Sequence, residues 1–144
     1  MTGIPFFMPM FFNIISKKKY VFLTFAVATN HFETMKVQEL VDKLNLKVLA
    51  GGQGLNRDID GCYISDLLSD VMGNAYEGNI WITLQIHKNV MAVASLKELS
   101  CIILVKNLVP NNDTIEQSNE EGLPLLQTDL PTYEIAGLVY NLLH

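Results

Sequence analysis

NIWITLQIHKNVMAVASLKELSCIILV, residues 79–105, carries the pattern that decides the fold. Its first six residues alternate and are rich in β-branched and aromatic side chains, which predicts a strand over Asn79–Leu84. Lys88–Leu99 is predicted to be helical, and Cys101–Val105 is apolar at every position, as in a central strand that is covered on both faces. A strand, a helix and a buried strand in this order predict a parallel βαβ unit.

From residue 35 to residue 144, helix and strand patterns alternate. Two apolar stripes have the i, i+3, i+4, i+7 spacing of a helix; they are Val37, Leu40, Val41 and Leu44, and Ile135, Leu138, Val139 and Leu142. Between the stripes we expect strands at Leu46–Ala50, Ile59–Ile64 and Leu125–Leu126, and helices at Asp66–Ala75 and Asp113–Glu121. Residues 35–144 are therefore predicted to form one α/β domain, with a mostly parallel sheet and helices on both faces.

Start and stop signals delimit the last two helices. Asp113, with Glu116 three residues later, gives a capping signal, and Gly122 follows the predicted helix end. Pro124 then prevents the helix from resuming. Pro131 stands where the first turn of the last helix tolerates proline.

The composition fits a globular domain and argues against a nucleic-acid-binding one. The chain has 144 residues, of which 49% are hydrophobic and 17% are charged, and this length suits one domain with a core. From Met35 onward seven basic residues stand against fourteen acidic ones. Because neutralising phosphates requires clustered Lys and Arg, no nucleic-acid partner is expected. Cys62 and Cys101 lack a C-x-x-C spacing and are interpreted as buried thiols in a reducing compartment.

The first 34 residues differ in kind from the rest and leave three interpretations open. They are rich in Phe and Met, and neither of their apolar runs reaches the ~18 residues that span a bilayer. Tyr20–Ala28 has the length of a signal-peptide core, although a signal peptide begins with its positive charge and here Lys17–Lys19 come late. Residues 1–34 are expected to be an unstructured or mis-assigned extension before Met35, a signal or membrane segment, or a structural element.

The glycine-rich stretch GGQGLNRDIDGCYISD, residues 51–66, raises the question of a phosphate site. A Walker loop needs Gly-Lys-Ser or Gly-Lys-Thr, and the chain contains neither. The dinucleotide pattern G-x-G-x-x-G also fails, because no third glycine follows Gly52 and Gly54 at the required place. A tight turn with positive φ is therefore the preferred interpretation.

Metal and nucleophilic chemistry both lack a complete set of residues. Asp66 and Asp70 are expected on one helix face, where two carboxylates can share a hard cation, but such a cation needs more oxygen ligands. Alternatively, Ser65 and Asp66 cap the helix that follows them. No G-x-S-x-G elbow occurs, and His87 is the only histidine of catalytic interest. No metal and no cofactor are predicted.

Polar residues follow several predicted strands, at the edge where open parallel sheets bind ligands. The candidate ligand-binding residues are Ser65, Asp66, Gln85, His87, Asn89, Asn107 and Thr128. They either contact a small ligand or serve as helix caps and loop polar groups. A small enzyme that uses His87 with Asp66, or a nucleotide-sensing site, is the alternative to a module without catalysis.

The predicted helix contains a segment, Asn89–Leu96, that is apolar nearly all round. One sheet face cannot bury such a helix completely. Either neighbouring elements enclose it or part of it meets a second subunit. We therefore predict a homodimer.

Two long runs of the sequence resemble the DRTGG domain, which is named for an Asp-Arg-Thr-Gly-Gly signature. They are LNLKVLAGGQGLNRDIDGCYISDLLSDVM, residues 44–72, and GNIWITLQIHKNVMAVASLKELSCIIL, residues 78–104. The signature is degenerate: Asn56-Arg57 stands for Asp-Arg and Asp60-Gly61-Cys62 for Thr-Gly-Gly. The resemblance implies family or structural roles for Gly51, Gly52, Gly54, Asn56, Arg57 and Gly61, with Arg57 held by Asp58, by Asp60 or by a partner's carboxylate.

The resemblance implies a fold similar to the N-terminal domains of HPr kinase/phosphatase and of murein ligases. DRTGG domains occur between CBS domains of regulatory pyrophosphatases and in phosphate acetyltransferases, where other domains carry the chemistry. The resemblance thus implies a cytoplasmic, bacterial, non-catalytic regulatory or oligomerisation module that binds a protein partner or a small regulatory ligand. Stand-alone copies beside hydrogenase-type and histidine-kinase-like genes imply a redox or signalling partner. The missing Walker loop argues against kinase activity.

Overall fold

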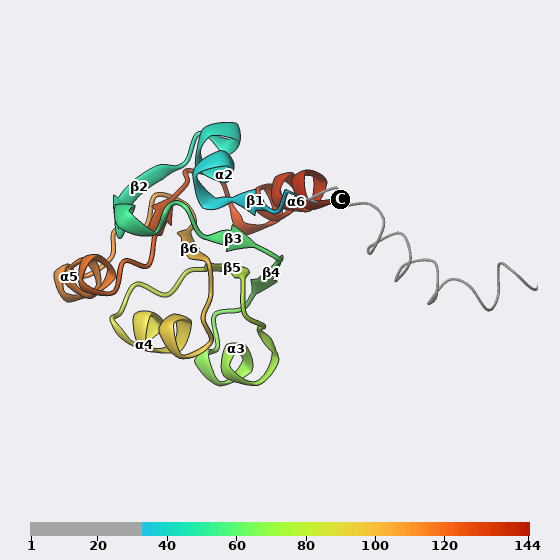
Figure 1. Cartoon of the computed structure of the whole chain (residues 1–144). Coiled ribbons are helices and arrows are strands. Elements are labelled where there is room, and N and C mark those ends of the chain that lie inside the picture. Colours follow the sequence, from blue (N-terminus) through green and yellow to red (C-terminus); the bar gives the residue numbers. More distant parts are fainter. Residues whose placement is uncertain (1–32) are drawn as a thin grey trace, which may run out of the picture. The chain divides into compact units, whose positions relative to one another are not determined.

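The computed structural model describes residues 33–144, and residues 1–32 of the predicted extension lie outside the described part. Its elements, labelled in Figure 1 where there is room, are β1 (Met35–Lys36), α2 (Val37–Leu44), β2 (Lys47–Ala50), the 3₁₀ turn η1 (Gly52–Gly54), β3 (Asp58–Ile59), β4 (Gly61–Ile64), α3 (Leu68–Asn74), β5 (Asn79–Thr83), α4 (Asn89–Leu96), β6 (Cys101–Leu104), α5 (Asn112–Glu121), β7 (Leu125–Gln127) and α6 (Thr132–Leu143). Thr34–His144 form one compact unit.

The main sheet has five strands in the order β2-β7-β6-β5-β4. The strands β4, β5, β6 and β7 run parallel, and β2 is antiparallel to β7. A separate antiparallel pair is formed by β1 and β3. The predicted mostly parallel sheet is thus confirmed, and β2 and β4 are its two edges.

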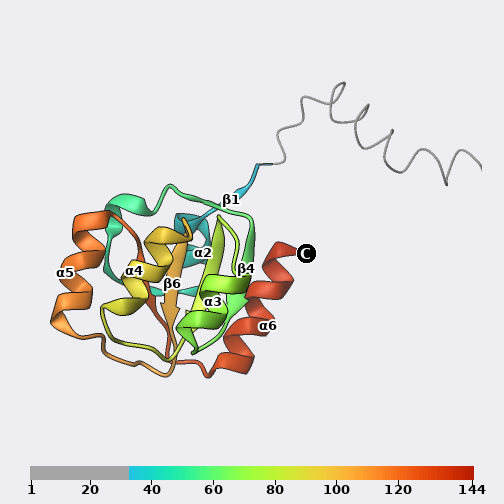
Figure 2. The ribbon, with the colours of Figure 1, turned by 90° about the horizontal axis from the view of Figure 1, so that it is seen from below.

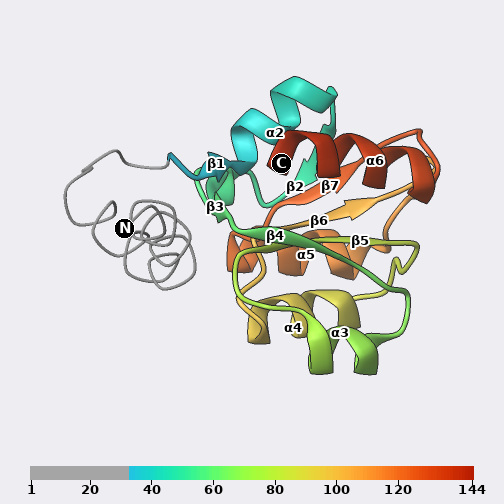
Figure 3. The same ribbon diagram turned by 90° about the vertical axis from the view of Figure 1, so that its right-hand side faces the viewer.

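Helices cover both faces of the sheet, as Figures 2 and 3 show. Because side chains alternate along a strand, Ile80 and Ile82 of β5 face one side and Trp81 faces the other. The first side packs against α2 and α6 in a core that includes Leu40, Val41, Ile135 and Val139. The second side packs against α3 and α4 in a core that includes Val71, Val90, Met91 and Ala94. The predicted three-layer α/β architecture is confirmed.

The helix predicted at Asp66–Ala75 is shorter in the structure, because Asp66 is used elsewhere. α3 begins at Leu68, and its N-cap Leu67 makes no side-chain cap hydrogen bond. The Asp66 carboxylate accepts hydrogen bonds from the hydroxyl of Thr83, at the end of β5, and from the backbone amide of Leu84. The expectation that Asp66 caps this helix, or lies on one helix face with Asp70, is therefore wrong.

The apolar helix α4 is only partly enclosed. Val90, Met91 and Ala94 are buried, whereas Leu96 is 71% exposed. The helix ends at Leu96, three residues before its predicted end, and Glu98 takes a left-handed φ of 52°. Neighbouring elements of the described part therefore do not enclose α4 completely, and the predicted contact of this helix with a second subunit stays a prediction.

The start of α5 also differs from the prediction. Asn111 is the N-cap residue and forms no side-chain cap hydrogen bond. Its amide group instead lies 3.0 Å from Nδ1 of His87. The predicted cap by Asp113 and Glu116 is therefore wrong, while the predicted end is confirmed, since Gly122 is the left-handed C-cap with φ of 60°.

Candidate functional site

The glycine-rich stretch forms a turn that connects several elements of the protein. Gly51 has a φ of 68°, and its amide donates to Oδ1 of Asn119 in α5 at 2.9 Å. The amide of Gly54 donates to the Gly51 carbonyl, also at 2.9 Å. The carbonyls of Leu55 and Arg57 accept the first two amides of α2, at 2.8 and 3.0 Å. The structure thus confirms a tight turn with positive φ. The backbone amides and carbonyls named above form their hydrogen bonds with other groups of the same chain.

The signature arginine contacts a backbone carbonyl. The Arg57 guanidinium donates to the carbonyl oxygen of Leu99 at 3.4 Å, and within residues 33–144 it forms no ion pair. Asp58 pairs with Lys36 instead, at 2.7 Å, and this bond holds the pKa of the Asp58 carboxyl below its usual value. The expectation that Asp58 or Asp60 holds Arg57 is therefore wrong.

Three of the predicted strand-end residues come together at the ends of β4 and β5. Oδ1 of Asp66 accepts from the hydroxyl of Thr83 at 2.9 Å and from the Leu84 amide at 2.7 Å. The Gln85 side chain donates to the Asp66 carbonyl at 3.0 Å. Ser65 accepts the indole N–H of the buried Trp81 at its carbonyl, at 2.8 Å. These polar groups hold the two loops together.

The other predicted residues form separate contacts. His87 is exposed, and its ring nitrogen Nδ1 lies within hydrogen-bond distance of the Asn111 side chain. Asn107 has a φ of 53°, and its backbone amide donates to the Thr128 carbonyl at 2.8 Å. Asn89 is the exposed first residue of α4. Within residues 33–144, His87 and Asp66 share neither a hydrogen bond nor an ion pair. The acid–base pair of the enzyme alternative is therefore not assembled in this arrangement.

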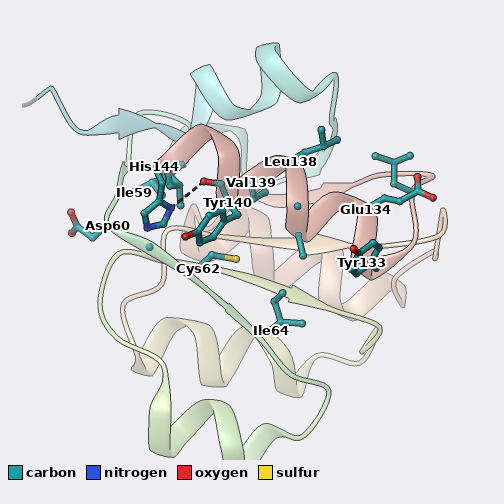
Figure 4. A pocket seen from close by; sticks show the side chains of 15 residues that line it. Ile59, Asp60, Cys62, Ile64, Tyr133, Glu134, Leu138, Val139, Tyr140 and His144 are labelled. Atoms are coloured by element: carbon teal, nitrogen blue, oxygen red, sulfur yellow. Dashed lines mark hydrogen bonds between the residues drawn. The ribbon is translucent and has the colours of Figure 1, made fainter.

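A large groove lies between the edge strand β4 and α6, and its volume is about 990 Å³ (Figure 4). Cys62 and Ile64 line its β4 side. Across the groove, α6 contributes Tyr133, Leu138 and Tyr140. Leu138 belongs to the predicted buried stripe of α6 but is 42% exposed. None of the seven predicted strand-end residues lines this groove.

Sequence reasoning missed the groove, because its two sides lie about seventy residues apart in the chain. One signal was present in the last helix. Tyr133 and Tyr140 lie off the buried stripe of Ile135 and Val139, and they are 90% and 63% exposed. Aromatic residues on the polar side of an amphipathic helix are typical of an interaction surface.

Cys62 is expected to be unreactive although it lines the groove. Burial raises the pKa of its thiol from an ordinary value of 9.0 to about 12, which leaves roughly 1000-fold less thiolate at pH 8. Iodoacetamide at pH 8 should therefore leave the native protein unmodified and alkylate both free cysteines, Cys62 and Cys101, after denaturation in urea. Mass spectrometry of the two samples checks this, and rapid native alkylation of Cys62 would contradict it.

Two smaller cavities carry acidic side chains. One, of about 390 Å³, is lined by Arg57, Asp60, Glu77 and Glu98 among others. The other, of about 520 Å³, lies between α4 and α5. Among residues 33–144 no group of three or more His, Cys, Asp or Glu side chains is placed to hold a metal ion. The helices of this same part are all too short or too polar to cross a membrane.

The family model of the DRTGG domain matches residues 39–142. This chain belongs to the DRTGG domain family. Among curated proteins, no sequence matched the chain.

A solved structure shares the fold of this DRTGG domain. It is the crystal structure of the CBS and DRTGG domains of the regulatory region of Clostridium perfringens pyrophosphatase, complexed with the activator diadenosine tetraphosphate. The similarity has a TM-score of 0.58 with 13% sequence identity and covers 72% of this chain. This chain spans only 45% of the length of the pyrophosphatase chain. With 13% sequence identity, the similarity shows a shared fold and no more.

Proposed function

We propose that this chain is a non-catalytic regulatory module that acts as a homodimer and binds a small regulatory ligand or a protein partner. The observation that carries the proposal is the contrast between two sites. At the strand ends, the Asp66 carboxylate already accepts hydrogen bonds from Thr83 and Leu84. The groove of β4 and α6, in contrast, presents exposed apolar side chains. Such a surface is suited to binding. The predicted redox or signalling partner belongs to this proposal.

A nucleotide-sensing site at the strand ends is the second candidate. The solved relative of the fold is a regulatory region in complex with a nucleotide activator. His87 and Asn89 are exposed at the start of α4, where a phosphate is favoured by the helix dipole. We propose that a nucleotide, if it binds, contacts these two residues.

The proposal is tested by a thermal-shift screen with AMP, diadenosine tetraphosphate, sugar nucleotides and inorganic phosphate on the full chain. A ligand that binds the folded state raises the melting temperature, because it adds RT ln(1 + [L]/Kd) to the free energy of unfolding. A nucleotide that binds at the strand ends, as in the second candidate, should shift the His87→Ala variant less than the wild type, and an Asn141→Ala variant, changed at an exposed position of α6, equally. Turnover of any of these compounds by the purified chain would contradict the non-catalytic proposal.

A further inference from the structure

The edge strand β4 leaves part of its backbone unpaired. In residues 33–144, β4 pairs with β5 on one side only. Since alternate residues of a strand direct their N–H and C=O groups to opposite sides, half of the β4 backbone groups point away from the sheet. Soluble proteins usually blunt such an edge with charged side chains or proline, but β4 has the sequence Gly-Cys-Tyr-Ile. Its backbone is therefore able to pair with an added strand.

The groove of β4 and α6 lies beside this edge and sets the shape of what can bind there. Its exposed apolar side chains are Ile64 of β4 and Tyr133, Leu138 and Tyr140 of α6. The side chains of an extended strand alternate between two faces. A strand on the β4 edge would therefore direct every second side chain into the groove, where an apolar side chain would be covered.

The charged side chains of the groove are acidic. Asp60 lies near one end of the groove and Glu134 near the other (Figure 4). Both are exposed, and within residues 33–144 neither takes part in an ion pair. Among the described residues that line the groove there is no Lys or Arg, although residues 35–144 contain seven of them. A segment with basic residues at its two ends is therefore complementary to the groove in charge.

A second copy of this chain lacks that complementarity. β4 is preceded by Asp60, and Asp66 follows two residues after its last residue, Ile64. If two β4 strands paired antiparallel, the start of each would lie beside the end of the other, and Asp60 of one copy would approach Asp66 of the other. Like charges opposite each other on paired strands destabilise the pair. A basic segment of a different protein meets no such repulsion.

We infer that the β4 edge binds an extended segment of a partner protein, which adds a strand to the sheet, places alternate apolar side chains in the groove and carries Lys or Arg at both ends. The inference rests on the protein partner of the proposed function and specifies its chemistry. In strand addition, backbone hydrogen bonds give affinity and side-chain pockets give specificity. With 12 residues, α6 is about 18 Å long, a length that about five extended residues cover.

Fluorescence anisotropy of a labelled synthetic peptide, Lys-Thr-Val-Thr-Phe-Thr-Lys, tests the inference on the full chain. We expect a Kd of roughly 100 μM or below at about 50 mM NaCl. Exchanging both lysines for glutamate should weaken binding at least about 10-fold. N-methylating every backbone amide between the lysines should do the same, because the peptide then has no donors for β4. Equal affinity of the three peptides, or no binding of the first at about 1 mM, would overturn the inference.

Two double variants of the protein test whether the acidic groups of the groove select the peptide. Asp60→Asn with Glu134→Gln should weaken binding of the lysine peptide about 5-fold or more at low salt and remove most of its advantage over the glutamate peptide. Glu116→Gln with Glu120→Gln removes the same charge from exposed positions of α5 and should change the Kd less than about two-fold. Equal effects of both double variants would mean that only net charge matters and would contradict the proposed site.

Sedimentation equilibrium distinguishes the other occupant of the edge, a second copy. Ile64→Lys, at an exposed position of β4, should abolish peptide binding without changing the oligomeric state of the full chain. A wild-type dimer that this substitution dissociates would show that a second copy takes the edge, and would overturn the inference. In that case the small regulatory ligand of the proposed function would be untouched, because the thermal-shift screen tests it separately.

Discussion

Gly54→Ala is expected to destabilise the protein by about 3 kcal/mol, because overpacking a rigid contact costs roughly 1–3 kcal/mol or more. A Cβ at this position would meet the carbonyl oxygen of Gly122 and would lie 2.7 Å from Cδ of Pro124. Both atoms belong to the connection between α5 and β7, which cannot retreat without moving a sheet strand. Against a typical total stability of about 5–15 kcal/mol, this loss should be plain in urea denaturation followed by tryptophan fluorescence.

Gly52→Ala is the matched control for that experiment. It lies two residues away in the same turn, but a Cβ there meets nothing within 4 Å and its φ is not positive. Alanine should therefore change the free energy of unfolding by less than about 0.5 kcal/mol, as at other unstrained surface positions. If both variants behaved alike, the turn would not be held against α5 and β7 as the structure indicates.

This pair of variants separates the two readings of the glycine-rich stretch. A phosphate loop would need its glycines so that backbone amides approach an anion. In the structure, Gly54 is needed because another part of the protein backbone approaches it. The spacing of the glycines predicted a tight turn, but the contacting segment lies almost seventy residues further along the chain. Only the tertiary structure identifies it.

The strands and their layers were predictable because their signals are local. The alternation of Asn79–Leu84 and the uninterrupted apolar run Cys101–Val105 reflect the two faces of a covered sheet. The break at Asp60 was not predictable in this way. The extended pattern of Ile59–Ile64 continues across it, and the separation into β3 and β4 arises from pairing of β3 with β1 and of β4 with β5.

The predicted strand-end residues show the same limit. Their position beyond the carboxyl ends of strands follows from the order of elements, and Asp66 and Gln85 do lie together. Their hydrogen-bond partners depend on how two neighbouring loops meet. Asp66 is a short polar residue before an apolar helix, so the local sequence predicts a helix cap. In the structure its carboxylate oxygen instead accepts a hydrogen bond from Thr83. The groove of β4 and α6 depends entirely on long-range packing.

Trp81→Ala is expected to cost about 3–5 kcal/mol, the range for removing a fully buried aromatic side chain from a core. Trp81 is completely buried in the second core, against Val71, Met91 and Leu104. Its indole N–H also donates to the Ser65 carbonyl at 2.8 Å, so the substitution would leave both a cavity and an unpaired acceptor. Because this is the only tryptophan, unfolding in urea has to be followed by far-UV circular dichroism.

Trp81→Phe divides this loss into its two causes. Phenylalanine keeps most of the buried area but cannot donate to Ser65, so its cost should be smaller, about 1–2 kcal/mol for the lost hydrogen bond and the partial cavity. Tyr76→Ala, at a side chain that is 75% exposed, serves as the control and should cost less than about 0.5 kcal/mol. If Trp81→Phe were neutral, the bond to Ser65 would contribute nothing to stability. The loop that carries Asp66 would then be held by the hydrogen bonds of Asp66 with Thr83, Leu84 and Gln85.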